Sequence, residues 1–287
     1  MTQTKTTYLV GTGIRHSLSP DLFRAAYSAL GLDVTYELID VTSADLARVE
    51  VMLRADECLG ASVTMPFKRW ATSIADRSDD AVQLSGAANL LVRTPTGLHA
   101  RNTDAMAVAR LIDHVRERVE NHVTLLAGAG GAAAATLWAL SQSPPRELII
   151  AVRSPAAHEG FATRARHHLV RTEVSLVDLA TLSARARRAT LVINATSVGM
   201  NDPGDDPLPD VAFTDETLLY DFVYRRDGAT ALQGRARRAR AQLVDGTGHL
   251  FEQALPAFRE LTGLEAPREV MARELARRIG RAPTVWH

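Results

Sequence analysis

The first hundred residues alternate short apolar runs with amphipathic stretches. The apolar runs have the length of strands and predict strands at residues 8–10, 34–40 and 61–64. Ser19-Pro20 predicts the start of the first helix, because serine is a good N-cap and proline suits the first helical position, and Gly31 predicts its end. Further signals predict a helix from Thr42 or Ser43 to about Arg54, a hairpin of residues 88–93 and 98–100, and a helix from Asp104 to about Val119.

From His122 the pattern becomes a regular alternation of apolar runs and helices. Six runs predict strands, at residues 123–127, 147–152, 174–177, 190–195, 218–223 and 242–244. Strands separated by helices imply a doubly wound parallel sheet. The tail from His249 to about Gly280 is helical, and we expect it to pack on the first domain. The chain is therefore an α/β protein with an α/β domain of residues 1–104 and 247–287 and a Rossmann-like domain of residues 105–246.

Composition and charge narrow the function to small-molecule chemistry. The 33 basic and 33 acidic side chains balance, which gives no electrostatic reason to expect nucleic acid or an anionic membrane as a partner. The single cysteine, Cys58, excludes an internal disulfide and favours a reducing cytoplasm. The first ten residues lack an apolar signal segment, and no run predicts a membrane span. The pair His167-His168 has no i, i+4 partner, so we expect no metal site.

Lysine is nearly absent from this chain, since only Lys5 and Lys68 among the 33 basic residues are lysines. Arginine stays protonated, whereas a partly desolvated lysine can release its proton and act as a general acid or base. Lys68 is therefore expected to handle a proton, the alternative being a chance surface lysine. Its best partner is Asp104, although an aspartate at that position could simply cap the following helix.

A glycine-rich turn follows the strand predicted at residues 123–127 and opens a helix. In this setting Gly128 makes the tight turn, Gly130 admits a pyrophosphate to the backbone, and Ala133 allows close packing of helix and strand. The alternative is a glycine turn in an unrelated βα unit. The dinucleotide interpretation assigns cofactor contacts to the whole turn: Gly128, Ala129, Gly130, Gly131 and Ala132.

The residues at the end of the strand predicted at 147–152 indicate which dinucleotide binds. A free ribose 2′-hydroxyl would favour an acidic residue there, but the sequence has Arg153-Ser154, and an arginine suits a 2′-phosphate. NADP is therefore expected, with NAD the less favoured cofactor. Arg153 could alternatively cover the surface.

The order of these motifs resembles the shikimate dehydrogenase family over nearly the full length of the chain. Eight blocks match in order, with x for a position that does not count toward the match: residues 13–20 (GIRHSLSP), 63–68 (VTxPFK), 86–89 (GAAN), 102–104 (NTD), 128–132 (GAGGA), 194–200 (NATSxGM), 221–224 (DFVY) and 245–253 (DGxxxLxxQ). The sequence departs from the family pattern at Phe23 (usually histidine), Ser62 (asparagine), Leu90 (threonine), Ala105 (glycine) and Arg225-Arg226 (asparagine-proline).

The resemblance implies a role for each matching polar residue. Lys68 and Asp104 would form the catalytic pair, and Ser17 and Ser19, assisted by Tyr224, would hold the substrate carboxylate. The ring oxygens would be bound by Thr64, Asn89, Asp104 and Gln253, and the matching blocks add Thr196 and Gly246 to the cofactor contacts.

The resemblance also implies the reaction, a reversible NADP-dependent reduction of 3-dehydroshikimate to shikimate. We expect a cytoplasmic enzyme, monomeric or homodimeric, that acts on a small ring carboxylic acid. Ser19, as serine rather than threonine, favours shikimate over quinate. Three alternatives remain: a related enzyme acting on quinate, one acting on an amino-substituted analogue, or a sensor that has lost turnover. Lys68 and Asp104 argue against the sensor, which would not need a titratable pair.

Overall fold

The computed structural model describes residues 4–182, 188–225 and 228–284, which form two compact units. Residues 4–106 and 250–283 make up the first unit, and residues 107–249 with Thr284 the second. The chain passes from one unit to the other inside two helices, α5 (Thr103–His114) and α11 (Gly246–Thr262), and once more between Pro283 and Thr284. The boundaries expected from the sequence, 104/105 and 246/247, lie in or beside the same helices.

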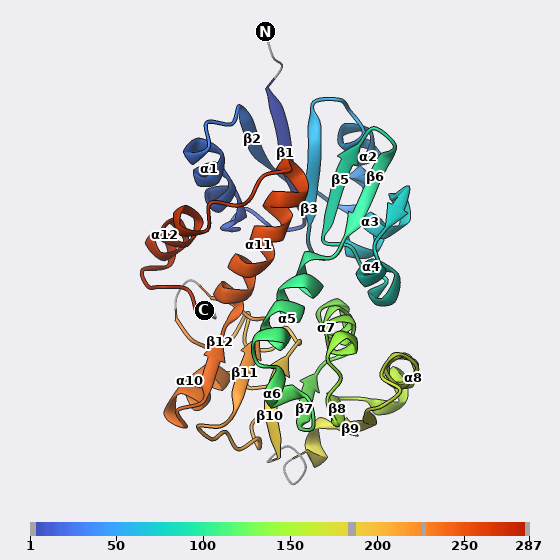
Figure 1. Ribbon diagram of the computed structural model, residues 1–287, viewed down its shortest axis with the longest axis vertical. Coiled ribbons are helices and arrows are strands. Elements are labelled where there is room, and N and C mark those ends of the chain that lie inside the picture. Colours follow the sequence, from blue (N-terminus) through green and yellow to red (C-terminus); the bar gives the residue numbers. More distant parts are fainter. Residues whose placement is uncertain (1–3, 183–187, 226–227, 285–287) are drawn as a thin grey trace. The chain divides into compact units, whose positions relative to one another are not determined.

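The first unit contains a mixed sheet of six strands in the order β2-β1-β3-β5-β6-β4 (Figure 1). The first three strands are parallel, and β5 runs antiparallel to both of its neighbours. The strands are β1 Lys5–Gly11, β2 Val34–Asp40, β3 Cys58–Val63, β4 Arg77–Ser78, β5 Leu90–Thr94 and β6 Gly97–Arg101. The other elements of this unit are α1 Ser19–Ala29, the 3₁₀ turn η1 Ser43–Asp45, α2 Leu46–Leu53, α3 Lys68–Ile74, α4 Asp80–Ser85 and α12 Arg268–Ile279.

Alternating side chains give this sheet two apolar faces. Tyr8 and Val10 of β1 lie on one face and pack with Val49 and Leu53 of α2. Successive strand residues point to opposite faces, so Tyr36 of β2, paired with Thr7, belongs to the other face. There the Tyr36 ring lies 4.8 Å from that of Phe23 in α1. Two helix layers therefore cover the sheet and leave the loops at the strand ends to carry function.

The C-terminal helices pack on the first unit, as expected from the sequence. Phe258 of α11 stacks on Tyr27 of α1 with the ring centroids 5.6 Å apart. Arg278 of α12 pairs with Asp21 of α1 at 2.6 Å. The tail is not one helix, because Gly263 (φ 72°) ends α11 in the left-handed region.

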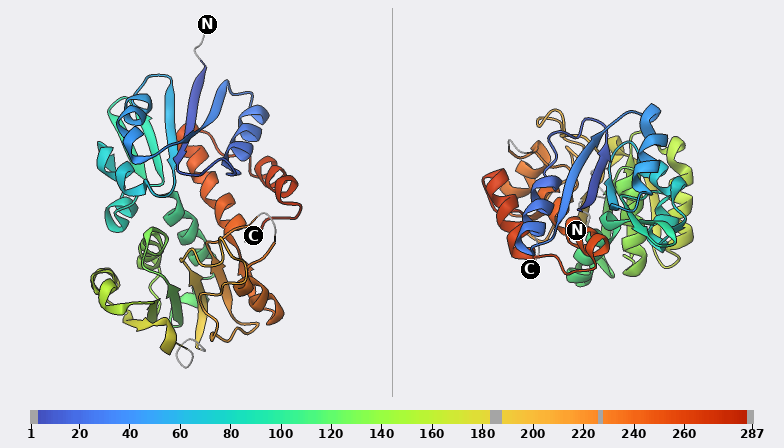
Figure 2. Two further views of the ribbon diagram at one scale, coloured as in Figure 1. Left: turned by 180° about the vertical axis from the view of Figure 1, so that it is seen from behind. Right: turned by 90° about the horizontal axis from the view of Figure 1, so that it is seen from above.

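The second unit is a parallel sheet of six strands in the order β12-β11-β10-β7-β8-β9, seen from behind in Figure 2. It confirms the predicted doubly wound sheet. The strands are β7 Val123–Ala127, β8 Glu147–Val152, β9 Glu173–Asp178, β10 Ala189–Asn194, β11 Leu218–Asp221 and β12 Gln242–Val244. The other elements are α6 Arg116–Val119, α7 Gly131–Gln142, η2 Pro155–His158, α8 Glu159–His168, η3 Leu179–Thr181 and α10 Ala231–Arg238. The strand order reverses between β7 and β10, and such a switch point is where nucleotides bind in these sheets.

Two helix predictions need correction. Ser19 was expected to cap α1, but Leu18 occupies the cap position and Ser19 is already helical. The Ser17 hydroxyl accepts the Ser19 N–H at 3.2 Å, so this amide is satisfied from before the helix. The helix expected from Asp104 to Val119 is divided, because Val115 (φ −110°, ψ 25°) leaves the helical conformation between α5 and α6.

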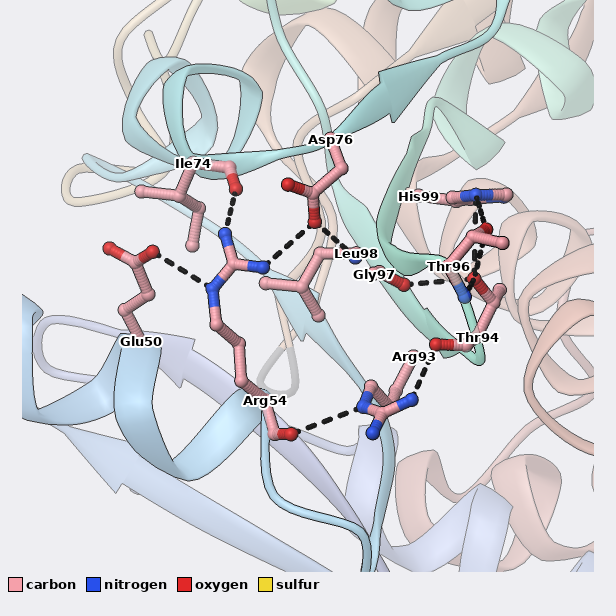
Figure 3. Close-up of polar contacts among 10 residues, drawn as sticks. All are labelled: Glu50, Arg54, Ile74, Asp76, Arg93, Thr94, Thr96, Gly97, Leu98 and His99. Atoms are coloured by element: carbon pink, nitrogen blue, oxygen red, sulfur yellow. Dashed lines mark hydrogen bonds and ion pairs between the residues drawn. The ribbon is translucent and has the colours of Figure 1, made fainter.

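A charged clamp closes the edge of the first sheet (Figure 3). Arg54, just after α2, donates to Asp76 at 2.8 Å and to the Ile74 carbonyl at 2.7 Å. The Asp76 carboxylate also accepts the Leu98 amide of β6 at 2.8 Å. The Arg54 guanidinium and this amide hold the pKa of Asp76 below its usual value. The clamp thereby joins α2, the segment before β4, and β6.

Within the described ranges, no helix is both long and apolar enough to cross a bilayer.

Candidate active site

Lys68 and Asp104 meet as the sequence predicted. Lys68 is the first residue of α3, and Asp104 lies in the first turn of α5. The Lys68 Nζ donates to Asp104 Oδ2 at 2.5 Å, and the side chains are 25% and 10% exposed. The pair is largely buried yet open to a small molecule. A chance surface lysine would not be held against a buried carboxylate in this way.

Asn102, not Asp104, caps helix α5. Its Oδ1 accepts the Ala105 N–H at 3.0 Å, and its Nδ2 donates to the Ala87 carbonyl at 2.9 Å. Asn102 therefore supplies the cap that the sequence analysis considered for Asp104, and the carboxylate of Asp104 contacts Lys68.

Thr103 joins two of the residues expected to bind ring oxygens. Asn89 donates from Nδ2 to Thr103 Oγ1 at 2.9 Å and accepts the Thr103 N–H at 2.6 Å. The Thr103 hydroxyl in turn donates to Gln253 Oε1 at 3.2 Å. Sequence reasoning quoted Thr103 only as part of a motif and gave it no role. Its complete burial between two amides makes it the residue that orients both.

Ser17 and Ser19 lie at the start of α1, and a third hydroxyl that the sequence analysis missed lies beside Ser19. Tyr36 of β2 is completely buried, and its Oη makes no hydrogen bond of ordinary geometry to a described residue. Burial raises the pKa of Tyr36 well above its ordinary value, and the hydroxyls of Ser62 and Ser19 oppose that shift. A tyrosine in the middle of a predicted strand gives no sequence signal for this position, because only the fold brings it to Ser19.

Thr64 directly follows β3, four residues before Lys68, and its amide donates to the Val10 carbonyl at 2.9 Å. Tyr224 follows β11 in the second unit, partly exposed. The residues that depart from the family pattern near these positions have structural partners. Leu90 is completely buried, and Arg225 donates to the Met200 carbonyl at 2.8 Å. Arg226 lies outside the described residues.

The glycine turn after β7 combines a conformation that favours glycine with open space beside its backbone. Gly128 has φ 104°, which favours glycine, and an added Cβ would lie 3.0 Å from the Ala195 carbonyl oxygen. Around Gly130 and Gly131 there is open space, with no atom within 4 Å of an added Cβ. Helix α7 starts at Gly131 without a side-chain cap, so its first amides face this space. The turn therefore fits the phosphates of a dinucleotide.

Arg153 and Ser154 follow β8, next to β7 in the sheet, and both are exposed. Among the described residues, the Arg153 side chain makes no hydrogen bond or ion pair. A guanidinium in this position is available to a phosphate, and the residue after the second strand is where a ribose 2′ substituent is recognised.

Thr196 forms hydrogen bonds within its own turn, and Gly246 packs closely against the backbone at Tyr224. The Thr196 hydroxyl donates to Asn194 Oδ1 at 2.7 Å and accepts the Val198 N–H at 3.2 Å, so it is already used by its own turn. An added Cβ on Gly246 would lie 2.5 Å from the Tyr224 nitrogen. Both residues can therefore meet a cofactor through main-chain atoms, or through the Thr196 methyl group, more readily than through a hydroxyl.

No group of three or more potential metal-ligating side chains occurs within the described part of the chain.

Comparisons with known proteins agree with this arrangement. A profile of the shikimate dehydrogenase substrate binding domain matches residues 9–91. An NADP(+) shikimate dehydrogenase of Anaeromyxobacter dehalogenans is 37% identical over 276 residues, covering 95% of this chain and 96% of that protein.

Solved structures agree over the same length. A shikimate dehydrogenase in complex with NADP⁺ superposes with a TM-score of 0.86 and 28% identity, covering 96% of both chains. The shikimate 5-dehydrogenase of Thermus thermophilus, in complex with NADP(H) and shikimate, gives a TM-score of 0.82 and 28% identity over 96% of this chain and 99% of that one. With its motifs, fold and relatives in agreement, the chain belongs to the shikimate dehydrogenase family.

Proposed function

We propose that this protein is an NADP-dependent oxidoreductase that reduces 3-dehydroshikimate reversibly to shikimate. The observation that carries the proposal is the contact of 2.5 Å between Lys68 Nζ and Asp104 Oδ2 in a largely buried setting. Family membership supplies the substrate and the cofactor, because the relative from Anaeromyxobacter dehalogenans is an NADP(+) shikimate dehydrogenase.

The proton step belongs to Lys68. Reduction of the ring carbonyl requires a hydride at carbon and a proton at oxygen, and the hydride comes from NADPH when it is bound. The Lys68 ammonium donates or relays the proton to the oxygen as the C=O π bond becomes an O–H bond. Asp104 keeps the ammonium in place and stabilises its charge. In the oxidative direction Lys68 accepts the proton of the hydroxyl.

Polar side chains, all of them neutral except Asp104, bind the rest of the substrate. We assign the ring oxygens to Thr64, Asn89, Asp104 and Gln253, supported by the way Thr103 fixes both amides. We assign the carboxylate to the hydroxyls of Ser17 and Ser19, with Tyr224 assisting. Donors of this kind suit a polyhydroxylated ring acid, because they bind oxygen without bringing a second fixed charge to Lys68.

The second unit holds the cofactor in this proposal. We assign the pyrophosphate to the turn of residues 128–132, the 2′-phosphate to Arg153 and Ser154, and the nicotinamide side to Thr196 and Gly246. The uncapped start of α7 and the open space at Gly130 support the first assignment. On this view residues 1–104 and 247–287 form the substrate domain, and residues 105–246 the dinucleotide domain.

We place the enzyme in a reducing cytoplasm, with a small ring acid rather than nucleic acid as its partner, and as a monomer or homodimer. The cysteine content supports the first point: Cys58 is the single cysteine, so the chain forms no internal disulfide of the kind that secreted domains use.

The test is an assay of shikimate and quinate, each with NADP⁺ and NAD⁺, followed by the gain of reduced-nucleotide absorbance. The proposal expects the fastest turnover with shikimate and NADP⁺. Faster turnover of quinate would move the assignment to the quinate-using branch. No turnover of any pair by a folded protein that binds NADP⁺ would favour a sensor.

A further inference from the structure

Asp221 stands at the end of β11 and is completely buried. Both of its oxygens accept hydrogen bonds. Oδ1 accepts Asn194 Nδ2 at 2.8 Å and the Val223 N–H at 3.0 Å, and Oδ2 accepts Gln233 Nε2 at 2.8 Å. Three donors from three different segments therefore converge on one carboxylate.

The first donor leads to the cofactor turn. Asn194 ends β10, next to β11 in the sheet, and is also completely buried. While its Nδ2 is held by Asp221, its Oδ1 accepts both the amide and the hydroxyl of Thr196, at 3.1 and 2.7 Å. Next to Thr196, the Ala195 carbonyl lies against Gly128. The orientation of Asn194 thus fixes the turn that backs the glycine loop.

The other two donors lead to the segment that carries Tyr224. Gln233 of α10 donates to Asp221 and also to the Val223 carbonyl at 3.0 Å, so residue 223 is bound at both its N–H and its C=O. The same carbonyl accepts the Gly246 N–H at 3.2 Å. Asp221 therefore also sets the backbone on which Gly246 packs.

We propose that Asp221 is a positioning residue for cofactor binding, whose carboxylate fixes the Thr196 turn and the Val223–Gly246 contact together. The inference rests on the proposed function, since it takes Thr196 and Gly246 to be cofactor contacts. It adds a residue that touches neither ligand.

The carboxylate must be ionised for this role. Every group that it faces is a donor, so a protonated oxygen or an amide nitrogen would point a hydrogen at another hydrogen. Burial raises the pKa of Asp221 to about 6, against the hydrogen bonds that lower it, and the nearby Asp245 carboxylate adds to the rise. Asp245 itself has Arg237 at 3.8 Å. Asp221 is therefore charged at neutral pH, and the contacts weaken as the pH falls below about 6.

The test is the equilibrium binding of NADP⁺ to Asp221→Asn, measured by calorimetry on folded protein. At neutral pH we expect about a tenfold higher Kd or more, since a hydrogen bond to a charged group is lost and a donor is left facing a donor. The Kd of the wild type for NADP⁺ should rise as the pH falls through about 6, where Asp221 becomes protonated. This rise should be much smaller in Asp221→Asn. Titration of the nucleotide phosphate affects both proteins equally, so it cancels when the pH profiles of the wild type and Asp221→Asn are compared. Asp210→Asn, an exposed carboxylate in the same unit, is the matched control and should bind as the wild type does.

A second variant separates positioning from stability. In Asp221→Asn combined with Gln233→Glu, the new amide can donate to the new carboxylate and still accept Asn194 Nδ2. Glutamate cannot donate to the Val223 carbonyl as Gln233 does at 3.0 Å, so the double variant restores only the branch through Asn194 and Thr196. Glutamate also keeps the capping box that residue 233 forms with Thr230. We expect at least threefold recovery of NADP⁺ affinity over Asp221→Asn.

Unchanged NADP⁺ affinity in folded Asp221→Asn overturns the positioning role, and no recovery in the double variant overturns the part of it that acts through Asn194 and Thr196. If Asp221→Asn does not fold, the test is made on the wild type. A pH dependence of its Kd for NADP⁺ that is fully explained by titration of the phosphate of free NADP⁺ also overturns the positioning role. Because binding is measured without turnover, these outcomes are distinct from a failure of the proposed function, which would show as wild-type protein that binds NADP⁺ but does not oxidise shikimate.

Discussion

At the scale of single residues, the choice between lysine and arginine separates a charge from a proton donor. Arg54 and Arg278 hold carboxylates at 2.8 and 2.6 Å, as fixed cations do throughout this chain. Lys68 holds one at 2.5 Å with a group that can also give up its proton. Arginine and lysine therefore make the same kind of contact with a carboxylate here, and they differ in whether the cation can release a proton.

The variants Lys68→Ala and Lys68→Arg should both lose turnover. Alanine removes the proton donor, and arginine keeps the charge but does not transfer a proton near neutral pH. NADP⁺ binding should change little in either, because Lys68 lies in the first unit and the glycine turn in the second. The measurement is kcat with shikimate and the Kd of NADP⁺. An arginine variant that keeps more than about a tenth of the wild-type kcat, a barrier change under ~1.4 kcal/mol, would contradict the proton-handling role.

Arg153→Ala should weaken NADP⁺ while leaving NAD⁺ nearly unchanged. The guanidinium can meet only the 2′-phosphate that NADP carries, and a charge-assisted contact of this kind contributes about 1.5–3 kcal/mol. The Kd of both nucleotides checks this, with Arg171→Ala, an exposed arginine of the same unit, as control. Equal weakening of both cofactors would make Arg153 a structural residue.

Ser17→Ala and Ser19→Ala should each raise KM for shikimate. A hydroxyl that binds the carboxylate does so in ground and transition states alike, and its loss costs about 1.5–3 kcal/mol, roughly ten- to a hundredfold. Since Leu18 occupies the cap position of α1, Ser19→Ala should not show the loss of about 1 kcal/mol that removal of a cap brings. Steady-state kinetics and a melting curve measure both effects, with the exposed Ser28→Ala of the same helix as control. Unchanged KM in both variants would place the carboxylate elsewhere.

At the scale of elements, the sequence predicted what depends on local pattern. All six strands of the second sheet were expected, because each is an apolar run of strand length, and β7, β8 and β12 have the predicted bounds. Short elements such as α3, α4 and β4 gave no periodic signal. The true cap positions, Leu18 and Asn102, depend on backbone angles and on hydrogen bonds that a residue preference does not specify.

The same limit applies to the candidate site. Lys68, Asp104 and the glycine turn could be found from motif and residue type. Tyr36 could not, and Asp221 was found only as part of the motif at residues 221–224, without a role. The neighbours of both residues come from other strands and helices, and only the folded sheets bring them together.

The clamp on the edge of the first sheet can be tested at Gly97, the first residue of β6. It has φ 117°, and an added Cβ would lie 2.1 Å from Asp76 Oδ2. Gly97→Ala should therefore lower the free energy of unfolding by about 1–3 kcal/mol, from backbone strain and from displacement of Asp76. Gly31→Ala, with φ 64° and no atom within 4 Å, shows the strain without the clash and serves as control.

Chemical denaturation of Gly97→Ala, Asp76→Ala and the double variant separates the two causes. If the clash matters, the double variant is less destabilised than the sum of the single ones, because Asp76→Ala removes the atom in the way. Strict additivity would leave backbone strain as the whole effect.

At the scale of the whole molecule, the chain path couples the two units. It crosses from one to the other within α5, within α11 and between Pro283 and Thr284, and the first two of these connections are helical. Unfolding either unit would remove the packing of part of each helix, and short isolated helices are unstable in water. The units should therefore unfold together.

Scanning calorimetry with NADP⁺ tests this coupling. At a concentration of about 100 Kd, a ligand that binds only the native state adds about 2.7 kcal/mol to the free energy of unfolding. Although the glycine turn lies in the second unit, we expect NADP⁺ to shift one common transition that reports both units. The probes are the tryptophans. The chain has three, Trp70, Trp138 and Trp286, so Trp138→Phe combined with Trp286→Phe leaves the fluorescence of Trp70 to report the first unit. If NADP⁺ leaves the Trp70 transition in place while the calorimetric peak splits, the units unfold separately and the helices do not couple them.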